Sequence, residues 1–98
     1  MSLPVKFRLE AQAEFHAATA WYESQLEGLG DDFIADVEET LDRVRLYPQS
    51  HRVVHRGLRQ AVMSRFPYSI IYSEDAVQIL VFAVFHARHD PVTWSRRV

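Results

Sequence analysis

Cysteine is absent from this chain of 98 residues, and glycine, with three residues, and proline, with four, are scarce. Without cysteine the chain has no disulfide framework, no thiolate nucleophile, no zinc ribbon and no iron–sulfur site. The three glycines form neither a phosphate-binding loop nor a nucleophile elbow, which argues against nucleotide cofactors and serine hydrolysis. We therefore expect no cofactor and a stability that comes from packing alone.

Long apolar runs are also missing. The longest run, residues 79–85, is far shorter than the ~20 residues that cross a bilayer, and no signal-peptide pattern opens the chain. We expect a cytoplasmic protein with no membrane partner. A hydrophobic content of 48% with 24% charged residues is typical of a folded chain, and the length suits a single domain over residues 1–98.

Positive charge is nearly missing from one part of the chain. Residues 9–42 carry ten acidic side chains and no lysine or arginine, whereas residues 43–98 carry nine arginines against three acids. The net charge of −2 and the pI near 6.2 argue against a surface wholly devoted to nucleic acid, for which a pI above ~9 is usual. The split predicts an acidic half and a basic half, and the basic half suits acidic partners.

Apolar periodicity predicts two helices in the first half. Apolar residues recur at spacings of three and four over 10–26 and again over 33–47, where Pro48 ends the pattern. The short link between the two segments contains two glycines, which predicts an antiparallel αα-hairpin. Alternation of apolar and basic residues over 3–9 predicts a strand before the first helix.

Strands fill the second half. After a linker over 48–57 we expect strands at Arg59–Phe66, Tyr68–Ser73 and Val77–His86, and then a short helix over Thr93–Val98 that Asp90-Pro91 begins. The last strand is apolar on both alternating faces, which predicts a central position covered on both sides. The hairpin covers one face, so the other face packs on short terminal elements or on a partner.

The order of these elements, together with a set of short motifs, resembles toxins of the RelE/ParE superfamily. The similarity extends over nearly the whole chain, and its specificity lies in the ordered set rather than in any one motif. The motifs are Ala20-Trp21-Tyr22-Glu23, residues 28–33, Tyr47-Pro48, Arg59–Arg65, residues 66–72, residues 81–91 and Trp94.

This resemblance implies a fold and a role. The fold is α+β, with an N-terminal strand, an αα-hairpin, a three-stranded antiparallel meander that completes a four-stranded sheet, and a short C-terminal helix. The role is that of a type II toxin of the ParE-like, plasmid-stabilisation type, neutralised by a cognate antitoxin. Such a chain forms a toxin–antitoxin hetero-oligomer or a homodimer.

The superfamily acts in two ways, and the resemblance leaves both open. ParE-like members inhibit DNA gyrase, whereas RelE-like members cut messenger RNA on the ribosome. For a ribonuclease, His86, Arg88 and His89 at the end of the last strand are candidate catalytic residues, because a histidine moves protons near neutral pH and an arginine holds a phosphate. The candidates for binding a target or the antitoxin are Arg59, Arg65, Arg88 and Trp94.

Two departures from the ribonuclease pattern favour the gyrase branch. RelE-like nucleases commonly carry an arginine at the position of Ser69 and a catalytic tyrosine near Trp94, and an indole has no phenolic proton to give. The acidic net charge also differs from that of a ribosome-directed nuclease, whose affinity depends on phosphate contacts. We therefore expect a gyrase inhibitor that is not an enzyme, with the ribosome-dependent nuclease as the alternative.

Other kinds of site are less well supported. His51 and His55 have the i,i+4 spacing of a helical metal site, but they follow Pro48 in a loop-like stretch. A site made of His86, His89 and Asp90 competes with the role of Asp90 as the cap of the last helix. We expect no metal. A third class remains open, an inactive family member that serves as an interaction module.

Overall fold

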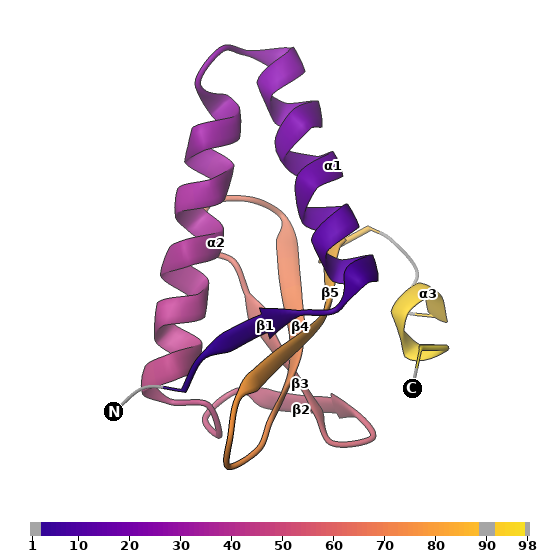
Figure 1. Cartoon of the computed structure of the whole chain (residues 1–98). Helices are drawn as coiled ribbons and strands as arrows, with labels where there is room; N and C mark the ends of the chain where they lie inside the picture. Colours follow the sequence, from indigo (N-terminus) through magenta and orange to yellow (C-terminus); the bar gives the residue numbers. More distant parts are fainter. Residues whose placement is uncertain (1–2, 89–91, 98) are drawn as a thin grey trace.

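Two long helices form a hairpin over one face of the sheet (Figure 1). In the computed structural model, which describes residues 3–88 and 92–97, α1 spans Leu9–Gln25 and α2 spans Leu29–Leu46. Both predicted helices are confirmed, and α2 begins four residues before the predicted Phe33. Its first turn is acidic and its last turn carries two arginines, which suits the helix dipole at both ends.

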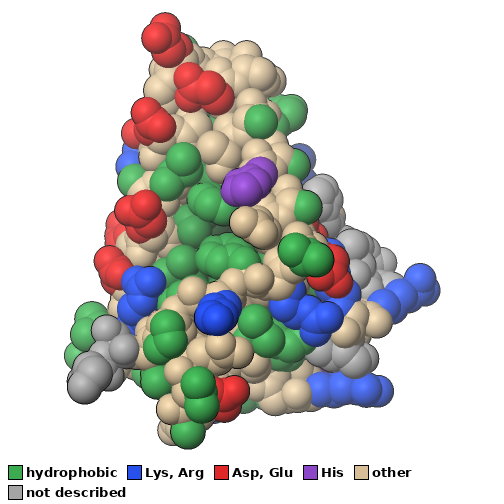
Figure 2. Space-filling view, viewed as in Figure 1, with side chains coloured by type: hydrophobic (Ala, Val, Ile, Leu, Met, Phe, Trp, Pro, Cys, Tyr) green, Lys and Arg blue, Asp and Glu red, His purple; other side chains and the backbone are tan. Residues whose placement is uncertain are grey.

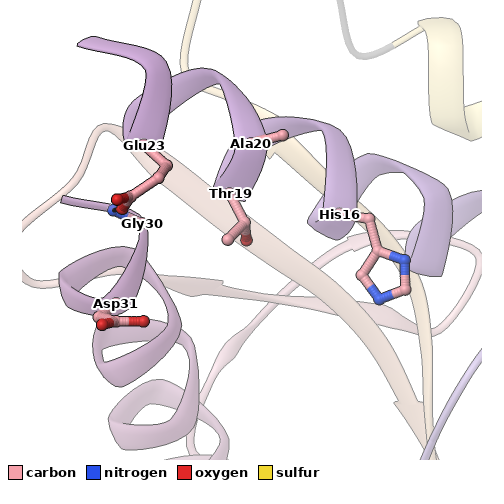
Figure 3. A pocket seen from close by; sticks show the side chains of 6 residues that line it. All are labelled: His16, Thr19, Ala20, Glu23, Gly30 and Asp31. Atoms are coloured by element: carbon pink, nitrogen blue, oxygen red, sulfur yellow. Dashed lines mark hydrogen bonds between the residues drawn. The ribbon is translucent and has the colours of Figure 1, made fainter. Parts of the chain in front are cut away.

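Glu23 of α1 accepts hydrogen bonds from backbone N–H groups at the start of α2 (Figure 3). Its carboxylate accepts the backbone N–H of Gly28 at 3.1 Å and that of Gly30 at 2.9 Å. Gly28 has a φ of +90°, a left-handed conformation that favours glycine and turns the chain between the helices. A side chain of the first helix thus supplies an acceptor for the unpaired N–H groups of the second, which ties the hairpin together.

Gly30 lies directly against α1. A Cβ atom there would be 2.9 Å from Oε1 of Glu23 and 3.1 Å from the carbonyl oxygen of Thr19. We expect Gly30→Ala to lower the free energy of unfolding by about 2 kcal/mol, because overpacking costs ~1–3 kcal/mol. Helix propensity alone predicts the opposite, a gain of about 1 kcal/mol. A urea titration in which Gly30→Ala is more stable than the wild type would contradict the close contact.

The sheet has five strands in the order β1-β5-β4-β3-β2. β3 (Leu58–Val62), β4 (Tyr68–Glu74) and β5 (Ile79–His86) form the predicted antiparallel meander, and β1 (Val5–Phe7) pairs with β5 in parallel. The prediction of four strands is wrong by one. The fifth strand, β2 (Arg52–His55), forms inside the predicted linker and pairs with β3.

The structure differs from the sequence prediction at two places here, the presence of β2 and the end of β3. β2 has only four residues, its register shifts between Val53 and His55, and Arg56 after it has a positive φ of 47°. So short and irregular a strand leaves no alternation to detect. β3 ends at Val62 rather than at Phe66, so the residues after Val62 form the turn into β4.

The main core lies between the hairpin and the sheet. Its side chains come from one stripe of each helix and from the helix-facing positions of the strands, as the periodicity predicts. Outside this core, Leu26 and Tyr47, at the ends of the predicted helical stripes, are exposed. The buried core residues are Ala11, Ala18, Phe33, Val37, Leu41, Val44, Ala61, Met63, Ile70, Tyr72, Ile79, Val81 and Val84.

Part of the second face of the sheet, around Ile71 and β5, is covered by the C-terminal segment, whereas Val62 on the same face is exposed. The short helix α3 (Val92–Ser95) places Trp94, which is 4% exposed, against Ile71 and the β5 side chains. A bulge in β5 opposite Ile71 turns both Phe82 and Ala83 to this face. The sequence left open whether a terminal element or a partner covers this face, and here a terminal element covers part of it. The predicted helix start at Asp90-Pro91 lies outside the described residues.

Arg97 fastens this segment to α1 and β5. Its guanidinium lies 2.8 Å from Oε2 of Glu14 and donates to the carbonyl oxygen of Phe82 at 2.9 Å. Oε1 of Glu14 also accepts the N–H of Val84 at 3.1 Å. Because β1 pairs only with Ile79–Val81, these two side chains satisfy polar groups on the part of the β5 edge that no strand covers.

Candidate functional site

A hollow with an aromatic lining lies between α1 and the adjoining ends of β4 and β5. It has a volume of about 530 Å³ and is lined by Trp21, Tyr22, Tyr68, His86 and Arg88; we call it the aromatic trough. Concave sites with aromatic walls and a few polar groups are the usual form of a binding site.

Ring contacts build the wall of the aromatic trough. The rings of Trp21 and Tyr22 meet edge to face at 5.1 Å, those of Tyr22 and Tyr68 at 6.1 Å, and those of Tyr68 and His86 at 5.1 Å. Tyr22 packs inward as well, on Phe33 at 5.3 Å, whereas Trp21 is 57% exposed. One ring of the Trp21-Tyr22 pair is therefore a packing residue and the other is available to a partner.

The two tyrosines are neutral hydrogen-bonding groups. Burial raises the pKa of Tyr22, and burial together with neighbouring Tyr22 raises the pKa of Tyr68. Both phenols therefore keep their protons at physiological pH. The positive charge of the trough comes from exposed Arg88.

His86 and Arg88, two of the predicted catalytic residues, do lie together. The backbone N–H of Arg88 donates to Nδ1 of His86 at 3.0 Å, an arrangement that leaves the proton of the neutral ring on Nε2. His86 stands opposite Tyr68 in the sheet register, so its side chain is on the helix-facing side. The third candidate, His89, lies outside the described residues.

The side chain of Arg59 binds a loop and does not line the aromatic trough. It pairs with Tyr72 in the register, which puts its side chain on the helix-facing side of β3. Its Nη1 donates to the carbonyl oxygens of Gln49 and His51, at 3.0 and 2.6 Å. These bonds close the segment between α2 and β2 onto the sheet, a structural task that already uses the guanidinium.

The remaining predicted binding residues lie elsewhere. Arg65 is in the turn after β3, half-exposed, with Nη2 3.8 Å from Oδ2 of Asp32, and such a loose exposed pair contributes little. Trp94 is a core side chain of the second face, packed on His55 and Phe85 with ring centroids 5.9 Å away in each case. The four predicted binding residues therefore do not share one surface: only Arg88 lines the trough.

Glu14 is a site residue that sequence reasoning missed. It lines a second hollow of about 250 Å³ that shares Trp21, Tyr68 and His86 with the aromatic trough. Glu14 and Trp21 are seven residues apart on α1 and thus on one helix face. That spacing was visible in the sequence, but the partners of Glu14, Arg97 and Val84, are distant in the chain.

Charge is distributed by layer. Figure 2 shows acidic side chains along the outer side of α2 and at the tip of the hairpin, and basic ones lower down, over the sheet. On the face in view this distribution agrees with the split between acidic and basic residues in the sequence. Among residues 3–88 and 92–97 no group of three or more potential ligands is placed to hold a metal, and no helix there is long and apolar enough to cross a membrane.

His51 lies near two arginines, Arg43 and Arg59, whose charges affect its pKa. Burial lowers its pKa, and nearby Arg43 and Arg59 lower it further, against a backbone hydrogen bond to Arg43 that acts in the opposite direction. The unfolded chain therefore takes up this proton at a higher pH than the folded one, and stability present above the unfolded value of 6.5 falls as the pH drops below it.

A pH series checks this histidine. Between about pH 7.5 and about pH 5.5 we expect the Tm of the wild type to fall, and His51→Gln to remove part of that fall, because a His is the side chain that titrates in this range. Thermal denaturation followed by circular dichroism measures both. Identical pH profiles for the two proteins would mean that His51 is not the group responsible.

Comparison with known proteins fits this architecture. Residues 5–91 match the model of the family described as the ParE toxin of the type II toxin–antitoxin system parDE. A search of curated protein sequences finds no match.

Two solved structures share the fold. A chain of the chromosomal ParDE toxin–antitoxin system from P. aeruginosa superposes with a TM-score of 0.61 at 15% identity, over 87% of this chain and 96% of that one. A chain of the RelBE2 toxin–antitoxin complex from Mycobacterium tuberculosis superposes with a TM-score of 0.61 at 20% identity, over 88% of this chain and 99% of that one. At such identities the likeness concerns the fold, whereas the family model covers most of the sequence itself: the chain belongs to the ParE toxin family of type II toxin–antitoxin systems.

Proposed function

We propose that this protein is a toxin that inhibits DNA gyrase and that a cognate antitoxin neutralises it. The observation that carries the proposal is the match of residues 5–91 to the ParE toxin family. The proposed inhibitor acts by binding, in the cytoplasm, and needs no cofactor. A role in plasmid stabilisation would follow from the same pairing of toxin and antitoxin.

The geometry of the candidate residues supports binding over RNA cleavage. A ribonuclease needs an acid/base group and an anion clamp around one phosphate. Here His86 and Trp94 lie on opposite faces of the sheet, and the guanidinium of Arg59 is engaged with loop carbonyls. Ser69, where nucleases of the superfamily commonly carry arginine, is buried and accepts a hydrogen bond from Gln60 at 2.9 Å.

A protein partner also suits the surface. Trp21 is a large aromatic side chain that is more than half exposed, and exposed aromatic residues beside a hollow are typical of protein interfaces. The two solved structures compared above belong to toxin–antitoxin systems. We therefore assign the aromatic trough to the antitoxin or to the target.

Induction of this protein alone in a bacterial host tests the proposal. We expect growth arrest with altered supercoiling of a reporter plasmid or gyrase-linked DNA breaks, and intact messenger RNA. Co-expression of the antitoxin should restore growth.

Two results would count against this function. Cleavage of translated messages at codon positions, abolished by His86→Ala or Arg88→Ala, would identify a ribosome-dependent nuclease instead. Unimpeded growth with a folded, well-expressed protein would indicate an interaction module that has lost toxicity.

A further inference from the structure

The aromatic trough continues into the hollow that contains Glu14. The two hollows, of about 530 and 250 Å³, share Trp21, Tyr68 and His86, so they adjoin along α1, and we call the two together the extended trough. Its helical wall carries Glu14, Ala17 and Trp21 at spacings of three and four, which puts them on one side of the helix. The extended trough is therefore a continuous surface with room for more than one side chain.

The middle of the extended trough is apolar and aromatic. Trp21 is 57% exposed on one wall, while half-buried Tyr68 and buried Val84 form the other. Small Ala17, exposed on α1, leaves space between them. An apolar side chain placed here would cover indole surface that now faces water, which is favourable at roughly 25 cal/mol per Å².

The two ends of the extended trough differ in charge: one carries an exposed arginine and the other a carboxylate that is already paired. At one end Arg88 is exposed beside the ring of His86. At the other end lies Glu14, whose carboxylate is already engaged by Arg97 and by the N–H of Val84. Because the charges of Glu14 and Arg97 compensate each other, Arg88 is the exposed cation that lines the trough, and an acidic group of the ligand is directed to it.

We propose that the extended trough binds a short protein segment in which a large apolar residue stands next to an acidic one. The apolar side chain lies between Trp21 and Tyr68, and the carboxylate pairs with Arg88. This inference rests on the proposed function, in which the segment belongs to the cognate antitoxin. The ligand chemistry follows from the charges and rings of the trough itself.

The two tryptophans of the chain provide the readout. Trp94 is 4% exposed and Trp21 57%, so acrylamide quenches Trp21 preferentially. The probes are acetyl-Glu-Leu-amide, the matched acetyl-Lys-Leu-amide, and AMP. We expect the Glu-Leu peptide to protect Trp21 from quenching and to bind about threefold more tightly than the Lys-Leu peptide, the size of an exposed ion pair.

Substitutions locate the binding. Arg88→Gln should abolish the preference for Glu-Leu over Lys-Leu, whereas Arg56→Gln, which removes an exposed arginine from the β2–β3 turn, should keep it. Trp21→Ala should weaken binding of the Glu-Leu peptide about tenfold, as loss of an aromatic anchor does, measured by NMR shifts at Tyr68 and Val84. Equal affinity for both peptides, tighter binding of AMP, or no protection by the Glu-Leu peptide would overturn the proposal.

A second measurement separates this inference from the proposed function. We expect the Kd of the toxin–antitoxin complex to rise about tenfold in Trp21→Ala and to stay unchanged in Leu26→Ala, an exposed apolar residue at the end of α1 outside the trough. An antitoxin that binds Trp21→Ala and the wild type equally would overturn the assignment of the trough while leaving the toxin role intact. Failure of any antitoxin to neutralise the wild type would instead remove the proposed function, and the peptide preference would still test the trough chemistry.

Discussion

Replacing Asp36 with alanine is expected to lower the free energy of unfolding by about 3 kcal/mol, because it removes the acceptor for three backbone donors. Asp36 is only 1% exposed although it lies on the acidic helix α2. Its two carboxylate oxygens accept the N–H groups of Ser64, Arg65 and Phe66 at 3.3, 2.9 and 3.0 Å. A carboxylate without these partners would not remain buried.

A matched pair of variants isolates the effect of these hydrogen bonds. Asp36→Asn keeps one acceptor oxygen and should cost less than Asp36→Ala. Asp42→Ala removes an exposed carboxylate of the same helix that pairs with Arg45 at 2.6 Å, and it should cost no more than about 0.5 kcal/mol. Chemical denaturation of the three variants gives the order directly. Equal losses for Asp36→Ala and Asp42→Ala would mean that the turn finds other acceptors.

Asp36 also shows why contacts between distant parts of the chain were harder to predict than the helices. In the sequence it is one of ten acids between residues 9 and 42. Its position three residues after Phe33 puts it on the buried stripe of α2, but the helical pattern alone does not show which groups its carboxylate binds. Its partners lie 28–30 residues further along the chain. The helices were predictable because their stripe is a local pattern, whereas the role of Asp36 depends on how α2 packs on a turn.

The same difference between a local pattern and a tertiary contact explains why Arg59 and Arg65 do not lie on one strand. Arg59 and Arg65 are spaced in the sequence as if on one face of one strand, but β3 ends between them. Arg59 is occupied by carbonyls of the preceding loop, which forms only when β2 pairs with β3. The aromatic pair of α1 shows the same dependence on packing, because Tyr22 contacts Phe33 of α2 whereas neighbouring Trp21 is exposed.

Phe33→Ala is the substitution for which we expect the largest loss, about 4 kcal/mol, since truncation of a buried phenylalanine costs ~3–5 kcal/mol. Phe33 is fully buried, and its ring is 5.3 Å from that of Tyr22 and 5.1 Å from that of Tyr68. It also meets the rings of Phe15 and Phe66, at 6.2 and 5.3 Å. For a domain with a typical stability of ~5–15 kcal/mol this loss is a large part of the free energy of unfolding.

The reason to measure Phe33 is its position beneath the aromatic trough. Tyr22 and Tyr68 form part of the trough wall and rest on Phe33, so a smaller side chain should disturb the wall as well as the core. Phe33→Leu keeps most of the apolar volume and should fold with a smaller loss, yet it should weaken binding of the Glu-Leu peptide. Calorimetry and the Trp21 quenching assay measure the two effects separately. If Phe33→Leu loses stability but binds the peptide like the wild type, Trp21 and Arg88 alone define the trough, and the aromatic packing beneath them serves only the fold.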